Sequence, residues 1–183
     1  MKKFASYLAA LVAVTFITST GRAQDVTTTN EWHGFGDYYH AQEVSVDAFA
    51  AGALGEQYIT DLSGDTVRRH GSLGAGLGVN YFFLRYLGLG AEASARNTTG
   101  KFIESASGNL IARWPICQTG LAPYIFGGAG HGFDPVDQTF GQAGTGLEFR
   151  FLRCAGIFTD ARYVFPDRTR DYAIVRAGVR VSF

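Results

Sequence analysis

The last twelve residues of this 183-residue chain alternate strictly between two kinds of side chain. One set is wholly apolar, and the other is polar, small or charged and includes Arg176 and Arg180. Successive side chains of a β-strand point to opposite faces, so the alternation predicts a strand with one apolar and one polar face. Because the chain ends on Phe183, the strand suits an apolar face against lipid, with an aromatic ring at the membrane interface.

The same alternation begins at Glu43 and continues to the end of the chain. It predicts eight strands of about ten residues, the length that a tilted strand needs to cross a membrane. The faces of the fifth strand stay open, because Pro123–Gly130 is apolar or glycine throughout. We expect the strands at about 43–53, 71–82, 87–97, 102–115, 121–131, 139–151, 156–165 and 172–183. Tight links alternate with four longer loops, at Gly55–His70, Thr98–Lys101, Gly132–Gln138 and Pro166–Asp171.

Alternation alone does not tell which face points into the barrel. A soluble lipocalin-like barrel or a sandwich would place the apolar set inside and the charged set outside. The polar set here is rich in glycine, which leaves room for large side chains across a narrow lumen. Its charges are mostly arginines and carboxylates, which suit a buried ionic interior. We therefore expect an all-β fold, an eight-stranded antiparallel up-and-down transmembrane β-barrel with its apolar face outward.

The N-terminus has the three parts of a secretory signal. Lys2 and Lys3 precede an apolar run from Phe4 to Ile17, and small residues flank a cleavage site after Ala23. A single transmembrane anchor is the alternative, but the run is shorter than the ~20 residues of a spanning helix. We expect a signal peptide at 1–23, an N-terminal periplasmic segment at 24–42 and the barrel at 43–183.

Cleavage of this signal changes the charge of the chain. It leaves 13 basic and 16 acidic residues, a formal net charge of −3. Such a balance argues against a nucleic-acid-binding protein.

With this signal and these strands, the chain resembles the small eight-stranded β-barrel proteins of the outer membrane, similar to the transmembrane domain of outer membrane protein A. The resemblance covers about residues 43–183 and also rests on Pro123–Gly130 and on the terminal Val179–Phe183. It implies the outer membrane of a diderm bacterium, and the even strand number places both termini on the periplasmic side. In that family the terminal aromatic residue is part of the signal read by the outer-membrane assembly machinery, a role that Phe183 would have here.

The polar faces of the predicted strands carry a set of charged residues that would meet in the lumen. An eight-stranded barrel is only just wide enough for its interior side chains, so opposite charges there would pair into a filled core. A small gated pore is the alternative, and the excess of two arginines would make it weakly anion-selective. The set consists of Asp47, Glu92, Arg96, Arg113, Glu148, Arg150, Asp160, Arg162, Arg176 and Arg180.

Cys117 and Cys154 are the only cysteines, and both fall in short links on the predicted periplasmic side. An oxidising compartment favours a bridge between them. Two free thiols are the alternative, because the spacing of the turns can exceed the Cα–Cα limit of about 7 Å.

Signals for catalysis are weak. Some eight-stranded outer-membrane barrels modify lipid A with a histidine and a serine, but the one close pair here, His70 and Ser72, lacks a convincing acid. None of His33, His40 and His131 is spaced from carboxylates in the way that metal-ligand motifs require. We expect no enzyme, no cofactor and no metal.

The expected role is therefore structural or adhesive, with the four loops facing outside. The expected surroundings are outer-membrane lipid and lipopolysaccharide, and the expected state is a monomer without nucleic acid. A narrow channel, a lipid A-modifying enzyme and a soluble ligand binder remain the alternatives.

Overall fold

The computed structural model describes residues 38–60, 66–96, 103–116, 119–133 and 137–183, and of 55–60, 66–70 and 96 the backbone alone. The predicted signal peptide and residues 24–37 lie outside the described residues, so the boundaries drawn at 23 and 24 stay predictions. In the part of the chain that is described, no helix is long and apolar enough to cross a membrane.

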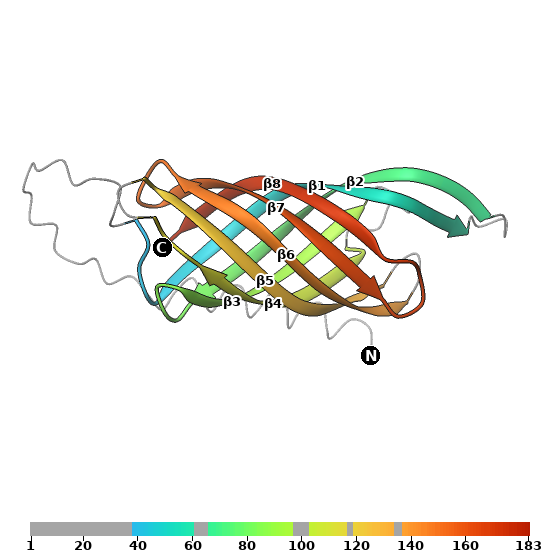
Figure 1. Ribbon diagram of the computed structural model, residues 1–183, viewed down its shortest axis with the longest axis horizontal. Coiled ribbons are helices and arrows are strands. Elements are labelled where there is room, and N and C mark those ends of the chain that lie inside the picture. Colours follow the sequence, from blue (N-terminus) through green and yellow to red (C-terminus); the bar gives the residue numbers. More distant parts are fainter. Residues whose placement is uncertain (1–37, 61–65, 97–102, 117–118, 134–136) are drawn as a thin grey trace, which may run out of the picture. The chain divides into compact units, whose positions relative to one another are not determined.

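The described residues form one closed, antiparallel barrel in which each strand pairs with its neighbours in sequence and β1 pairs with β8 (Figure 1). β8 ends at what we call the terminal end, together with the described link residues 83–86, 114–116, 119–120 and 151–154. The other four connections lie at the opposite end, which we call the loop end. The strands are β1 Glu43–Thr60, β2 Thr66–Phe82, β3 Leu87–Arg96, β4 Ser105–Arg113, β5 Leu121–Gly132, β6 Gln138–Arg150, β7 Ala155–Pro166 and β8 Tyr172–Ser182.

β1 and β2 are longer than expected. The loop predicted at Gly55–His70 is wrong, because β1 continues to Thr60 and β2 begins at Thr66. The register of β1 against β2 shifts between Ala53 and Glu56. This irregularity interrupts the alternation of apolar and polar side chains from which the strands were predicted. Past it the two strands pair only with each other, and Figure 1 shows their ends extending beyond the neighbouring strands.

The apolar faces point outward, as predicted. Leu77, Val79, Ile125 and Val179 are all more than half exposed, whereas charged residues on the opposite faces of the strands, such as Asp47, Glu148, Asp160 and Arg180, are buried. This placement contradicts the soluble lipocalin-like alternative, which needs the apolar set inside. It also settles the ambiguous β5, where Tyr124 and Phe126 face the lumen and Ile125 faces outward.

Exposed aromatic side chains gather near the two ends of the barrel. Such rings form the girdles that border the apolar band of transmembrane barrels. Tyr81, Tyr86, Trp114, Phe151 and Phe183 lie at the terminal end, and Phe133, Tyr163 and Phe165 lie toward the loop end.

Glycines on the lumen face make room for aromatic rings. A Cβ atom on Gly144 would come within 2.6 Å of the Phe126 ring, and one on Gly88 would come as close to the Phe82 ring. Both distances are below any real packing contact. The glycine-rich polar faces therefore belong to a narrow interior filled by large side chains.

Candidate functional site in the barrel lumen

Glu43, the first residue of β1, holds two arginines at the terminal end of the lumen. Its carboxylate accepts from Arg113 Nη1 on β4 at 2.9 Å and from Arg150 Nη2 on β6 at 2.6 Å. All three side chains are buried. A buried ion is tolerated only when it is paired and hydrogen-bonded, and Glu43 supplies the charge for both guanidinium groups.

The ion pairs continue from Arg150 toward the middle of the barrel. Arg150 Nε donates to Glu148 at 2.6 Å, and Glu148 also accepts from Arg180 Nη1 on β8. Arg180 in turn makes two hydrogen bonds of 2.7 Å to Asp47 on β1. Neighbouring inward positions on β1, β4, β6 and β8 thus form one network, which we call the terminal network.

A second group of charges, the loop-side network, lies nearer the loop end. Arg176 on β8 makes hydrogen bonds of 2.9 and 2.6 Å to Asp160 on β7, and its Nη1 donates to Glu92 on β3 at 2.6 Å. Arg162 on β7 also donates to Glu92 and, at 2.9 Å, to the Gln142 side chain. Each carboxylate in this group accepts from at least one arginine on another strand.

Aromatic rings lie between the two networks. The guanidinium groups of Arg180 and Arg176 lie over the Phe158 ring, 5.0 and 5.8 Å from its centroid. The Tyr124 hydroxyl donates to Asp160 at 3.1 Å, and Arg180 lies over the same ring. The charges therefore pack against rings as well as against each other, which leaves little room along the axis.

These contacts place nine of the ten charged residues singled out in the sequence within the lumen. The tenth, Arg96, lies outside the residues whose side chains are described. Sequence reasoning missed Glu43, although it has the same parity as Ser45 and Asp47. The ion pairs described join five arginines to five carboxylates, so within this set the expected excess of two arginines is absent. The expectation of a weakly anion-selective path stays a prediction, because the side chain of Arg96 is not among those described.

Sequence reasoning also missed Tyr39, which is buried at the terminal end. Its ring lies under two guanidinium groups, with centroid distances of 5.0 Å to Arg113 and 4.2 Å to Arg150. Its hydroxyl donates to the carbonyl oxygen of Gly120 at 2.8 Å. Burial raises the pKa of the Tyr39 hydroxyl, which keeps the proton that this bond requires. No periodicity marked residues 38–42, and so no signal in the sequence pointed to this contact.

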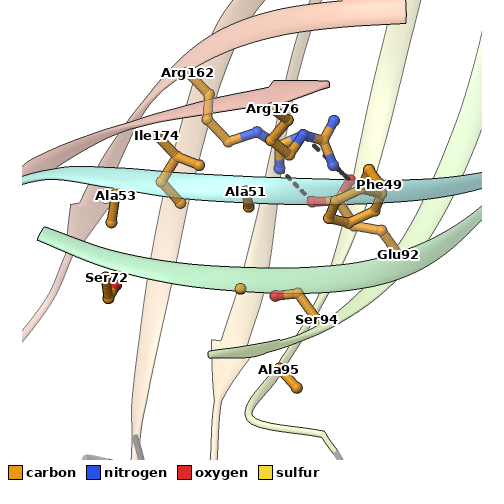
Figure 2. A pocket seen from close by; sticks show the side chains of 11 residues that line it. Phe49, Ala51, Ala53, Ser72, Glu92, Ser94, Ala95, Arg162, Ile174 and Arg176 are labelled. Carbon is orange, nitrogen blue, oxygen red and sulfur yellow. Dashed lines mark hydrogen bonds and ion pairs between the residues drawn. The ribbon is translucent and has the colours of Figure 1, made fainter. Parts of the chain in front are cut away.

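Two adjoining cavities of about 30 Å³ each border the loop-side network. In Figure 2, Arg162 and Arg176 extend to Glu92, while Ser72 and Ser94 line the nearby wall. A space of this size has room for water but not for a substrate with a carbon skeleton. The lumen is therefore narrow at this end, where apolar side chains such as Val164, Tyr172 and Ile174 lie beside the charged ones.

The other singled-out residues lie outside the lumen contacts. Cys154 is an exposed free cysteine, and Cys117 lies outside the described residues, so the predicted bridge is not observed and stays unconfirmed. His131 Nε2 lies 3.0 Å from Asp137 near the loop end, and the side chain of His70 is not described. No group of three metal-ligating side chains occurs among the described residues. Phe183 is 77% exposed and its backbone pairs with Val44.

Comparison with solved structures identifies proteins with the same architecture. The N-terminal β-barrel domain of OprF from Pseudomonas aeruginosa superposes with a TM-score of 0.59 at 16% identity, over 79% of this chain and 99% of that one. The chain has the fold of a small eight-stranded transmembrane β-barrel. Its outward apolar face and its filled polar lumen agree with that fold.

Two further structures give the same result. Neisserial surface protein A has a TM-score of 0.54 at 16% identity, over 77% of this chain and 96% of that one. Ail, the attachment invasion locus protein of Yersinia pestis, was solved with the heparin analogue sucrose octasulfate; it has a TM-score of 0.53 at 17% identity, over 78% of this chain and 99% of that one. No protein-family model matches the sequence, and no curated protein does.

Proposed function

We propose that this protein is an integral β-barrel of the outer membrane of a diderm bacterium, with a structural or surface-interaction role and a lumen closed by side chains. The observation that carries the proposal is the pairing of five arginines with five carboxylates inside a barrel whose outside is apolar. Ions packed in this way occupy much of the interior and balance each other's charge, which favours a closed lumen over an open aqueous path.

The surroundings follow from the same surface. Outer-membrane lipid and lipopolysaccharide would cover the apolar band between the two aromatic groups, with both termini on the periplasmic side. The C-terminal strand, with its exposed Phe183, would be read by the outer-membrane assembly machinery. We propose a monomer, without a cofactor, a metal or a nucleic-acid partner.

Gel mobility tests this proposal most directly. The membrane fraction is run unboiled and boiled in detergent, with and without reductant. A closed barrel resists cold detergent, so a change of mobility on heating is expected. Recovery in the soluble periplasmic fraction, with no such change, would contradict membrane insertion. A further change with reductant would support the Cys117–Cys154 bridge.

A narrow channel is the second candidate, because small cavities border Glu92 at the loop end. Planar-bilayer recordings of the purified protein distinguish the two. We expect no steady conductance steps from the intact chain. Regular conductance steps whose frequency increases with protein concentration would favour the channel.

The surface-interaction part of the proposal has its own test. Ail, one of the proteins of similar fold, was solved with a heparin analogue, and retention on immobilised heparin at low salt is the corresponding measurement here. Retention that is lost with increasing salt would support a polyanion-binding surface. A lack of retention would favour the structural role.

A lipid A-modifying enzyme is a further alternative, and its activity would have to be lost in His70→Ala or His131→Ala.

A further inference from the structure

Residues 38–42, which we call the strap, turn back across the terminal end of the lumen instead of extending β1 outward, and Tyr39 is the one of them that is buried. The backbone carbonyl of Tyr38 accepts a hydrogen bond from Arg150 Nη1, and that of His40 accepts one from Arg113 Nη2 at 3.1 Å. The Tyr39 ring lies between these contacts, beside both guanidinium groups. A single aromatic side chain therefore covers the terminal network.

The backbone at Gln42 makes this turn possible. Its φ is 59°, the left-handed region, and it is the one non-glycine residue with positive φ among those described. This conformation is uncommon for a residue with a side chain and persists only where the surroundings impose it. Residue 43, next in the chain, already belongs to β1. Gln42 is thus the point at which the chain leaves the wall and enters the lumen.

The strap can leave the lumen without leaving any buried arginine unpaired. Arg113 keeps Glu43 and the carbonyl of Arg85, to which its Nε donates at 2.9 Å. Arg150 keeps Glu43 and Glu148. The strap itself contributes no carboxylate to these pairs, only carbonyl oxygens, a ring and the His40 N–H, which donates to Glu43 at 3.4 Å. Losing it therefore exposes arginines that remain paired, which costs far less than breaking the ion pairs themselves.

We propose that the strap is a removable plug, with Tyr39 as the seal of the lumen at the terminal end and Gln42 as its hinge. This inference goes beyond the proposed role, because it concerns access to the lumen from one side. Release of the strap would open the terminal network to water while the barrel stays closed and inserted.

The test measures access to Ser45, a fully buried lumen residue on β1 whose hydroxyl accepts from Asn80 at 3.2 Å. Ser45→Cys is made in the full chain with Cys117→Ser and Cys154→Ser, so that it is the only thiol. A charged, water-soluble thiol reagent is added to the folded protein in detergent micelles, and the rate of modification is followed by mass. The cold-detergent gel shift shows that each variant still forms the barrel.

Modification is expected to be slow with the strap intact and in Tyr39→Phe, which keeps the ring. Tyr39→Ala should speed it by about tenfold or more, which corresponds to opening that is easier by roughly 1.4 kcal/mol. Gln42→Pro, whose ring fixes φ near −65°, should have the same effect without touching Tyr39, whereas Gln42→Gly should leave the rate low. Ser94→Cys, near the loop end, should react at one rate in all these backgrounds.

Three results would overturn the proposal or its hinge. Rapid modification of Ser45→Cys with the strap intact would show that Tyr39 does not seal the lumen. An unchanged slow rate in both Tyr39→Ala and Gln42→Pro would show that the ion pairs alone close it. Acceleration in Tyr39→Ala without acceleration in Gln42→Pro would overturn the assignment of Gln42 as the hinge.

Discussion

Arg180 on β8 and Asp47 on β1 form a two-point ion pair across the strand pair that closes the barrel. Both hydrogen bonds, Nε to Oδ1 and Nη2 to Oδ2, measure 2.7 Å, and the two residues are direct partners in the β1–β8 register. The first and last strands of the barrel are therefore joined inside the lumen as well as along their backbones.

Removing one member of this pair should destabilise the barrel strongly. We expect Asp47→Ala to lower the free energy of unfolding by about 3–5 kcal/mol, because it leaves the Arg180 guanidinium short of a charge partner in a buried site. Denaturant titration of the protein refolded into phospholipid vesicles measures the change.

The double variant is the control for this prediction. Asp47→Ala with Arg180→Ala should cost less than the sum of the single changes, since neither charge is then left without the other. Additive losses would mean that the two side chains do not stabilise each other.

The Tyr124 hydroxyl should contribute through its bond to Asp160. Tyr124→Phe keeps the ring between the two networks and removes one hydrogen bond to a charged acceptor, a loss of about 1.5–3 kcal/mol in the free energy of unfolding. Tyr163→Phe is the matched control, because that ring is exposed on the outside of β7. Equal effects of the two changes would contradict the role given to the Tyr124–Asp160 bond.

Two glycines of β6 should respond differently to the same substitution. Gly144→Ala places a methyl group against the Phe126 ring and the carbonyl of Ala161, both 2.6 Å away, and should cost about 1–3 kcal/mol of folding stability. Gly141→Ala meets no atom within 4 Å and should be neutral or slightly stabilising. Denaturant titration of both variants measures the change, and the two substitutions lie on the same strand and add the same methyl group. A similar loss of folding stability in both would contradict a crowded lumen at Gly144.

The outward face of β2 should reject a charge. Leu77→Arg puts a guanidinium group into lipid and should lower the folding free energy in vesicles by up to about 2–4 kcal/mol, the range for the bilayer midplane. Leu84→Arg, at an exposed position of the β2–β3 link, should be tolerated. Equal tolerance of both variants would indicate that the apolar face of β2 does not meet lipid.

Strand positions and faces follow from local information, and most of them were predicted. An alternation such as that of Tyr172–Phe183 depends only on the pleat of one strand, so it needs no knowledge of partners. It was uninformative in β5, where both faces are apolar or glycine, and at the irregularity after Ala53. There the register with neighbouring strands decides, and register is a property of the closed sheet.

The sequence by itself thus determined the barrel, its strand count and nine of the charged residues that point inward. Only the tertiary structure decided which charges meet. Glu92 pairs with Arg162 and Arg176, 70 and 84 residues away, because the stagger of the closed strands brings β3, β7 and β8 to one level of the lumen. Tyr39 belongs to the same class of finding. Its place depends on one left-handed turn and on two arginines from distant strands, and neither leaves a periodic pattern in the chain.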